Sequence, residues 1–359
     1  MRITFIGKRI YTNRDAILDQ YGRIYQLPHH WSNLGTANDL WLIDYHRKEH
    51  ICESSGNFSV KSTPIFKRSF WQELRDIIQR KHEPNDIIVA SGDCYIGLLA
   101  YNIAKQKRVK FVFDVYDKYD EFSGHFNLPG FNLLKFLISK ANICLFASKK
   151  LMRELSQDQE NDILVPNGID GKRFDRLSKT DSRKKFRISE KAILIGYFGG
   201  MEPDRGVEDL ISAVKIVRSQ GVPIQLVMGG ANPPNLDLNA QAVCYLGNIP
   251  YIDMPEILAC CDLLSIPYRR SPFMDSGSSN KIAEYIASRR PIVATETPNL
   301  TENFPTQAKK LSGLLAKPGN PSDIARTILL QFKSPILLDM PSNMMWNEIA
   351  RYSLERLKD

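Results

Sequence analysis

The sequence predicts an α/β protein made of two doubly wound halves. Short apolar runs of strand length alternate with amphipathic stretches of helix length, which is typical of parallel sheets covered by helices. The chain has 359 residues, enough for two domains of ordinary size. A polar and basic stretch at 170–190 separates two such series and is expected to be a linker. We therefore expect domains at 1–168 and 169–344.

The first half opens with an apolar strand at 2–6 that runs into a glycine. Gly7 is expected to allow a tight turn and the close approach of a ligand. Because the G-x-G-x-x-G pattern is missing there, the signal for dinucleotide binding is weak. Further strands are expected at 40–43, 86–90, 109–113, 143–146 and 163–165. Helices are expected at 70–80, 95–105, 130–141, 149–155 and 15–27, the last ended by Pro28.

Acidic residues follow several of these strands. Ligands of doubly wound sheets bind at the carboxyl ends of the strands. Asp93, Asp114 and Asp117 are each expected at such an end, as is Gly7. This edge is therefore the candidate ligand-facing side of the first domain.

The second half repeats the pattern, with glycine pairs after its first two strands. The pairs are Gly199-Gly200 and Gly229-Gly230. Strands are expected at 192–198, 224–228, 243–246, 263–267 and 292–294. Helices are expected at 207–220, 254–261, 281–288, 321–332 and 346–357. We expect the amphipathic C-terminal helix, within 345–359, to cross back to the first domain.

The most informative stretch is 262–295, which reads as strand, polar loop, helix and strand. Unpaired N–H groups at a helix start attract anions, and Lys281 adds a positive charge at that end. Glu284 lies one turn further on and could accept hydrogen bonds from two sugar hydroxyls. These groups suit a nucleotide, although an ordinary βαβ unit with a surface Lys–Glu pair is the alternative. The loop holds four candidate N-caps: Ser276, Ser278, Ser279 and Asn280.

Composition narrows the class of protein. Apolar residues make up 43% and charged residues 25%, which is usual for a soluble globular protein. No apolar run reaches about 18 residues, and the first apolar run is too short for a signal peptide, so we expect a cytoplasmic protein. The six cysteines form no C-x-x-C pair, and we expect no metal site. Cys144 and Cys244 lie in apolar runs and are expected to be buried free thiols.

The net charge of +8 is spread over both halves. The stretch 67–81 mixes aromatic and aliphatic residues with Arg and Lys at helical spacing, which could rest on an anionic membrane surface. A packed surface helix is the alternative. Nucleic-acid binding has charge in its favour but no recognised motif, and we do not expect it.

Five motifs in fixed order cover about 170–300, and together they resemble retaining glycosyltransferase family 4, whose members have the GT-B fold. The motifs are VPNGID with Phe174, YFGGMEPDRGVEDLISA, LVMGG, YLGNIPYIDMPEILACCDLLSIPY and SSNKIAEYIASRRPIVAT. Residues 1–168 match only in general layout. The resemblance implies two Rossmann-like domains that face each other across a cleft, with the nucleotide-sugar donor bound mainly by the second.

The resemblance also implies roles for individual residues. Arg205 aligns with a diphosphate-binding lysine, Lys281 would face the phosphates, and Glu284 aligns with the ribose-binding glutamate. Asp117 lies where the family has a His or Asp near the reacting carbon of the sugar. The implied catalytic set is Asp117, Asp275, Arg205 and Lys281. The implied donor-binding set is Gly7, Gly199, Gly200, Arg205, Gly229, Ser278, Ser279, Asn280, Lys281 and Glu284.

Two positions depart from the family pattern. An acid is expected at position 276, where this chain has Ser276, and Asp275 is one residue away. The family often has an arginine where this chain has Gly200, and Arg269 or Arg270 would have to supply the missing cation. These departures leave open an inactive relative.

We therefore expect a metal-independent retaining transferase of the hexosyltransferase type that uses no cofactor. It would move a sugar from a UDP- or GDP-sugar to a glycan or lipid-linked acceptor, in cell-surface polysaccharide or glycolipid synthesis. It would be cytoplasmic, with peripheral contact to the inner face of an anionic membrane. The alternatives are a sugar-nucleotide epimerase of the same fold and a non-catalytic, glycosyltransferase-like partner subunit.

Overall fold

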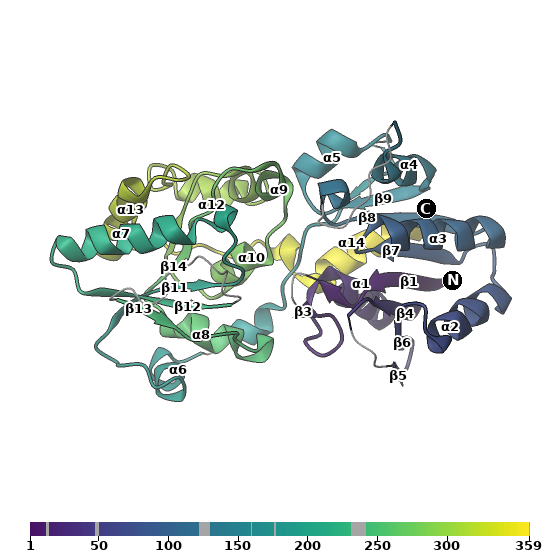
Figure 1. Cartoon of the computed structure of the whole chain (residues 1–359), viewed down its shortest axis with the longest axis horizontal. Helices are drawn as coiled ribbons and strands as arrows, with labels where there is room; N and C mark the ends of the chain where they lie inside the picture. Colours follow the sequence, from purple (N-terminus) through teal and green to yellow (C-terminus); the bar gives the residue numbers. More distant parts are fainter. Residues whose placement is uncertain are drawn as a thin grey trace. The chain divides into compact units, whose positions relative to one another are not determined.

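The structure is a computed structural model. It describes residues 1–11, 14–46, 50–121, 130–158, 160–175, 177–230 and 242–358. The chain divides into two compact units (Figure 1). The first unit comprises Met1–Gly168, Ser276–Ser278 and Asn343–Asp359, and the second comprises Ile169–Asp275 and Ser279–Ser342.

The first unit is built on an eight-stranded sheet with the strand order β10-β9-β8-β7-β1-β4-β6-β5. All neighbouring strands are parallel except β5, which pairs with β6 in antiparallel fashion. The expected parallel sheet is confirmed, and the β5–β6 hairpin was not predicted. The strands are β1 (Arg2–Lys8), β4 (Ala37–Asp44), β5 (Ile51–Ser55), β6 (Phe58–Pro64), β7 (Ile87–Ser91), β8 (Lys110–Val115), β9 (Ile143–Phe146) and β10 (Ile163–Leu164). A separate small pair consists of β2 (Ile10–Tyr11) and β3 (Arg14–Asp15).

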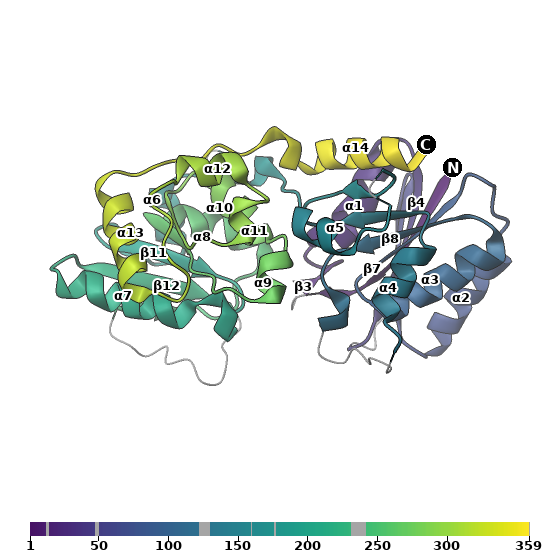
Figure 2. The ribbon, with the colours of Figure 1, turned by 90° about the horizontal axis from the view of Figure 1, so that it is seen from above.

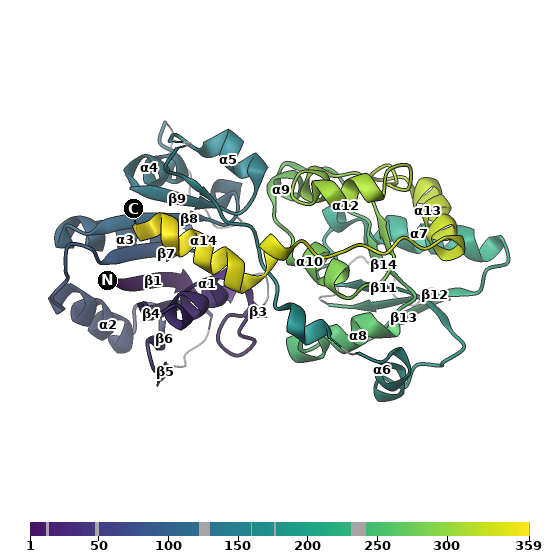
Figure 3. The ribbon, with the colours of Figure 1, turned by 180° about the vertical axis from the view of Figure 1, so that it is seen from behind.

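Helices from both ends of the chain pack on this sheet. The C-terminal helix α14 (Trp346–Lys358, yellow in Figure 3) lies beside α1 (Gly22–Asn33), and Trp31 donates a 3.0 Å hydrogen bond to Ser353. Trp346 and Ile349 of α14 belong to the core of the first unit. The other helices are α2 (Arg68–Gln79), α3 (Cys94–Lys107), α4 (Leu133–Lys140) and α5 (Lys149–Leu155), with the 3-10 turn η1 (Tyr119–Glu121).

The expected helix at 15–27 is wrong in position. Gln20 has a positive φ angle of 47°, which ends the preceding turn, and α1 begins only at Gly22, whose φ is 72°. Pro28 lies inside α1 and does not end it. A proline inside a helix costs about 3 kcal/mol because a backbone hydrogen bond is lost. The buried face of α1, which includes Leu27 and Trp31, offsets that cost by packing.

The second unit is built on a five-stranded, fully parallel sheet with the order β13-β12-β11-β14-β15. Helices α7 (Val207–Ser219) and α13 (Pro321–Lys333) lie side by side over one face and share an apolar core with it (Figure 2). The strands are β11 (Ile193–Phe198), β12 (Ile224–Gly229), β13 (Val243–Tyr245), β14 (Leu263–Ile266) and β15 (Ile292–Ala294). Further helices are α8 (Met254–Cys260), α9 (Pro272–Ser276), α10 (Asn280–Ala287), α11 (Pro298–Thr301) and α12 (Pro305–Lys310), and the 3-10 turns include η3 (Pro203–Arg205) and η4 (Tyr251–Asp253). The 3-10 turn η5 (Ser342–Met344) lies where the chain returns to the first unit.

The stretch at 170–190 is more structured than a linker. It contains the 3-10 turn η2 (Gly171–Phe174) and the helix α6 (Lys179–Lys185). Arg183 of α6 is buried, and it donates hydrogen bonds to Cys260 O (2.9 Å) and to the Asp262 carboxylate (2.9 Å). The many basic residues suggested a solvated linker, but this arginine anchors the stretch to the second unit.

Two further findings bear on the sequence predictions. Cys144 is buried as expected, but Cys244 is exposed because it lies on β13, the edge strand of its sheet. Within the described ranges, no helix combines the length and apolar character needed to cross a lipid bilayer.

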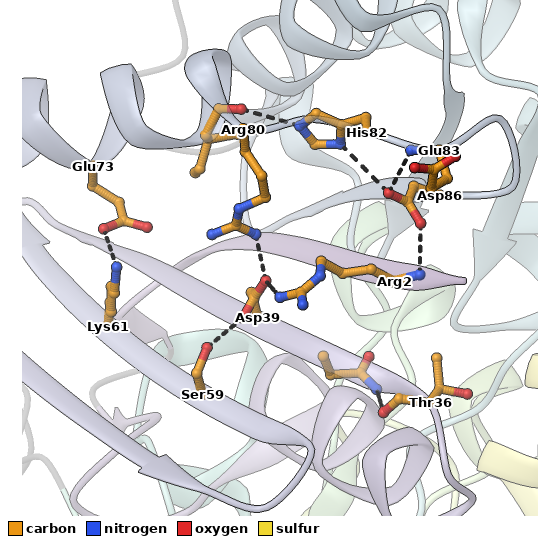
Figure 4. A network of polar contacts seen from close by, with 12 residues as sticks. Arg2, Thr36, Asp39, Ser59, Lys61, Glu73, Arg80, His82, Glu83 and Asp86 are labelled. Atoms are coloured by element: carbon orange, nitrogen blue, oxygen red, sulfur yellow. Dashed lines mark hydrogen bonds and ion pairs between the residues drawn. The ribbon is translucent and has the colours of Figure 1, made fainter.

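A polar network ties α2 to the sheet of the first unit (Figure 4). Asp39 of β4 accepts hydrogen bonds from Arg2 (2.8 Å), Arg80 (2.5 Å) and Ser59 (2.5 Å). Burial raises the pKa of Asp39, but the hydrogen bonds from Ser59 and Arg2 and the charge of Arg80 outweigh it, so the pKa lies below its ordinary value. The carboxylate therefore stabilises the fold in its charged form.

Candidate nucleotide-binding site

Glycine pairs after β11 and β12 bring three backbone segments together at the carboxyl edge of the second sheet. Gly199 N donates to Gly229 O and Gly230 N donates to Gly247 O, both at 2.8 Å. A Cβ atom on Gly230 would collide with Gly199 O, and one on Gly229 would lie 2.6 Å from Ile249. Glycine is therefore required here by close packing of the turns, at the edge where open α/β sheets bind ligands.

Lys281, in the first turn of α10, is held against an aromatic face at this edge. Its Nζ lies 3.8 Å from the centre of the Tyr197 ring and 5.4 Å from that of Tyr268. A Cβ on Gly199 would lie 2.7 Å from the same nitrogen, so glycine leaves room for the ammonium group. Burial lowers the pKa of Lys281, and the charge of Arg205 lowers it further. A negatively charged ligand would stabilise this ammonium group.

Arg205 lies next to the same tyrosine. Its guanidinium carbon is 5.5 Å from the centre of the Tyr268 ring and 5.9 Å from that of Phe273. Gly206 follows it with φ of 68°, and a Cβ there would collide with Pro267 O, so the turn that presents Arg205 requires glycine. Arg205 and Lys281 are 76 positions apart in the sequence, and the structure places both beside the Tyr268 ring.

The loop before α10 divides its contacts between the two units. The Ser279 hydroxyl lies 2.9 Å from Tyr268 Oη, and its backbone N–H donates to Asn299 (3.1 Å). Ser279 is the N-cap residue of α10 but makes no side-chain bond to the first turn, which begins with Asn280. Ser278 groups with the first unit, where its backbone oxygen accepts a hydrogen bond from Asn167. Of the predicted loop residues, Ser279 and Asn280 therefore lie in the same unit as Lys281, whereas Ser278 is grouped with the first unit.

Glu284 lies one turn after Lys281 on α10 and is partly exposed. Burial has the largest effect on the pKa values of Lys281 and Tyr268, and the charge of Glu284 raises both. The charge of Glu284 therefore acts on the two residues that line the cation site, and its role toward a ribose stays a prediction.

Asp275 and the two neighbouring arginines are engaged in ion pairs. Arg270 donates from Nε to both carboxylate oxygens of Asp275 at 2.8 Å. Arg269 binds both oxygens of Asp209 at 2.7 Å. Both arginines are therefore paired with carboxylates of the second unit, and compensation by either one for Gly200 stays a prediction.

In the first unit, Asp117 follows β8 and is held by aromatic residues. Tyr11 donates a 2.5 Å hydrogen bond to its carboxylate, and the Tyr11 and Tyr116 rings stack at 4.7 Å. Burial and then the charge of Asp117 raise the pKa of Tyr11. The tyrosine therefore stays protonated and fixes the orientation of the carboxylate. Asp117 is 8% exposed.

Three other residues predicted at this edge have internal roles. Gly7 lies within β1, because that strand continues to Lys8, and a Cβ on it would lie 2.7 Å from Ile24 of α1. The expected tight turn is therefore wrong, and Gly7 permits close helix packing. Asp114 is fully buried and accepts hydrogen bonds from Arg23, and Asp93 caps α3 through Ile96 N at 2.9 Å.

Sequence reasoning missed Glu202, Tyr197 and Tyr268. The two tyrosines form the aromatic surface beneath the cations, and Glu202 lies 3.4 Å from Arg205 Nε. The tyrosines border apolar runs and read as ordinary core residues, so only their position at the carboxyl ends of β11 and β14 could have pointed to them. Within the described residues, no cluster of three or more His, Cys, Asp or Glu side chains could hold a metal ion.

Comparison with known proteins finds a family match for part of the chain. Residues 192–332 match the family described as glycosyl transferases group 1. The matched stretch is less than half of the chain. It includes all five strands of the second sheet, together with Arg205, Lys281 and Glu284.

Two curated glycosyltransferases match parts of the chain. The putative teichuronic acid biosynthesis glycosyltransferase TuaH of Bacillus subtilis is 22% identical over 163 residues, which are 44% of this chain and 40% of that protein. The GDP-mannose-dependent monoacylated alpha-(1-6)-phosphatidylinositol monomannoside mannosyltransferase of Corynebacterium glutamicum is 29% identical over 114 residues, 29% of this chain and 30% of that protein. The match thus spans less than half the length of either relative.

The likeness to solved structures extends over the whole chain. The alignment with the structure of Anabaena Alr3699/HepE in complex with UDP-glucose covers 99% of this chain and 95% of that chain, with a TM-score of 0.63 and 14% identity. This likeness, outside residues 192–332 as well as within them, confirms the predicted GT-B fold with two doubly wound, Rossmann-like units.

Proposed function

We propose that the protein is a glycosyltransferase that takes its sugar from a nucleoside diphosphate sugar. The observation that carries this proposal is the pair of cations, Arg205 and Lys281, beside the Tyr268 ring at the start of α10. The diphosphate leaving group gains negative charge as the sugar departs. Fixed cations and helix N–H groups stabilise that charge without a metal ion.

The remaining residues have proposed roles around this pair. Glu284 binds the ribose, and the Gly199 and Gly229 turns let the nucleotide approach the backbone. Asp117, held by Tyr11, acts near the reacting carbon of the sugar, and transfer retains the anomeric configuration. Asp275 shapes the sugar side of the loop through its pair with Arg270.

We propose UDP or GDP as the nucleotide, and a glycan or lipid-linked acceptor that contributes to a cell-surface polysaccharide or glycolipid. HepE was solved with UDP-glucose, and the Corynebacterium relative is named for its use of GDP-mannose and a phosphatidylinositol mannoside. The name of the Bacillus relative refers to teichuronic acid biosynthesis. These relatives support the classes of donor and acceptor.

A thermal-shift screen of the purified protein against UDP, GDP, ADP and their sugars, with a chelator present, tests the donor proposal. A ligand that binds the native state raises the midpoint according to its concentration relative to its dissociation constant. We expect one nucleotide and its sugars to give a clear shift. A flat screen with an intact fold would contradict the proposal.

One observation favours a second candidate, a non-catalytic partner subunit. The Asp275 carboxylate is neutralised by Arg270, and the Ser276 side chain is buried, so position 276 offers no acid to a sugar. Such a subunit would bind the nucleotide without turnover. Mass spectrometry of donor and acceptor mixtures separates the two candidates, and hydrolysis or isomerisation of the donor alone would instead indicate an epimerase.

We also propose peripheral contact with the cytoplasmic face of an anionic membrane through the start of α2. Phe66 and Trp71 are 69% and 50% exposed, and their rings lie 6.3 Å apart. Lys67, Arg68 and Arg75 are exposed on the same short stretch. Aromatic side chains that border cations are favoured at the interface of anionic lipids.

A further inference from the structure

The space beside Gly200 is filled by a carboxylate. A Cβ on Gly200 would collide with Glu202 Oε2 and would lie 2.7 Å from Oε1. Glu202 Oε2 is 3.4 Å from Arg205 Nε. The Glu202 carboxylate therefore lies between position 200 and the guanidinium group of Arg205.

Glu202 acts on both members of the cation pair. After burial and Arg205, which lower the pKa of Lys281, the charge of Glu202 is the first influence that raises it. Burial lowers the pKa of Arg205 and the two tyrosines raise it, and the charge of Glu202 is the next influence that raises it. The neighbouring Asp204 accepts a hydrogen bond from Ser271 (3.2 Å), which holds it toward the other side of the turn. Glu202 therefore contacts Arg205 directly and acts on Lys281 through its charge.

We propose that Glu202 is an internal counter-anion that occupies the diphosphate position beside Arg205 and must leave before the donor binds. This inference rests on the proposed function, because it concerns the same cations. The carboxylate lowers donor affinity by stabilising the empty site. It also favours ligands with enough charge to displace it, so a nucleoside diphosphate binds more readily than a monophosphate.

The exchange requires little rearrangement. The Glu202 side chain is 53% exposed, whereas that of Arg205 is 22% exposed. A half-exposed glutamate can turn into solvent at a small cost, because exposed ion pairs contribute only about 0–1 kcal/mol. The cations remain fixed on their tyrosines, so a diphosphate meets a site that is already arranged.

Removal of the charge is the direct test. Calorimetric titration with the nucleoside diphosphate that gives the largest thermal shift should show about two- to fivefold tighter binding to Glu202→Gln than to the wild type. The nucleoside monophosphate should gain more than the diphosphate, so the preference for the diphosphate narrows. Glu208→Gln is the matched control, because Glu208 is an exposed glutamate of α7 that lies 3.7 Å from Arg269. Its affinity should equal that of the wild type.

Displacement of the carboxylate without a change of charge is an independent test. Gly200→Ala should push Glu202 aside, because a Cβ there meets only the end of that flexible side chain. We expect tighter diphosphate binding in this variant too. The double variant should gain less than the sum of the two single gains, because both substitutions remove the same interaction.

The outcomes separate the inference from the proposed function. If the wild type binds a nucleoside diphosphate and Glu202→Gln binds it equally or more weakly, the inference is wrong and the proposed donor site stands. If neither protein binds a nucleotide while both melt cooperatively, the proposed function and the inference fail together. Additive gains in the double variant would also overturn the inference.

Discussion

At the scale of single residues, the donor site depends on two charged side chains one turn apart on α10. Lys281→Ala and Glu284→Ala should each weaken binding of the nucleoside diphosphate by roughly 1–3 kcal/mol, the usual worth of a hydrogen bond to a charged group. Lys215→Ala, on the exposed face of α7, is the matched control and should change nothing. Calorimetric titration measures the affinity of the three variants for the nucleoside diphosphate. Unchanged affinity in both site variants would contradict the assignment of the donor site.

The lowered pKa of Lys281 predicts a pH dependence of binding. The cause is burial, followed by the charge of Arg205. Since a diphosphate needs the charged ammonium group, its affinity should fall as the pH rises through this lowered pKa, well before an ordinary lysine would lose its proton. Binding in that range should also take up a proton. Titrations in buffers of different ionisation enthalpy detect the uptake, which should vanish in Lys281→Ala.

At the scale of elements, the exposed start of α2 predicts membrane binding. The protein should co-sediment with vesicles that contain anionic phosphatidylglycerol and much less with neutral phosphatidylcholine, and added salt should weaken the binding. The double variant Phe66→Ala, Trp71→Ala should bind about tenfold less, because each side chain loses apolar contact with the lipid. Phe131→Ala, 43% exposed elsewhere in the same unit, is the control. Equal binding to both kinds of vesicle would argue against the proposal.

The network around Asp39 predicts how α2 and its sheet respond to acid. The folded-state pKa of Asp39 is lowered, so its contribution to stability is present above its ordinary pKa and disappears as the pH falls through the lowered one. At pH 7, Asp39→Asn should reduce the free energy of unfolding by roughly 1–3 kcal/mol. The difference from the wild type should shrink in acid.

Chemical denaturation at several pH values measures that difference. Asp76→Asn is the control, because Asp76 is an exposed carboxylate on α2 itself. A constant difference between Asp39→Asn and the wild type from pH 7 to pH 2 would show that the charge of Asp39 is not what stabilises this region.

Much of the arrangement of elements could be predicted because both sheets follow from alternating apolar runs and amphipathic helices. The antiparallel hairpin of β5 and β6 was missed, since β5 is exposed and lacks an apolar run. Pro28 was misread because its local cost is outweighed by packing of residues distant in sequence. Such long-range contacts leave no local signal in the chain.

The candidate site was predictable only where charge and glycine mark it. Arg205, Lys281 and Glu284 stand out as charges beside turns, and the structure groups them. The aromatic surface of Tyr197 and Tyr268 could not be predicted, because a buried tyrosine at the end of a strand resembles any core residue. Glu202 was overlooked because its importance comes from a neighbour, Gly200, that has no side chain.

At the scale of the whole molecule, α14 has a consequence for the order of events during synthesis. A Cβ on Gly168 would lie 2.7 Å from the Trp346 ring, so the last helix closes tightly over the end of the first unit. Residues 346–358 leave the ribosome only after the whole second unit has been translated. Until then Trp31 lacks its partner Ser353, and the core of the first unit lacks the apolar side chains of α14. The first unit therefore cannot complete its fold before the second unit has been synthesised.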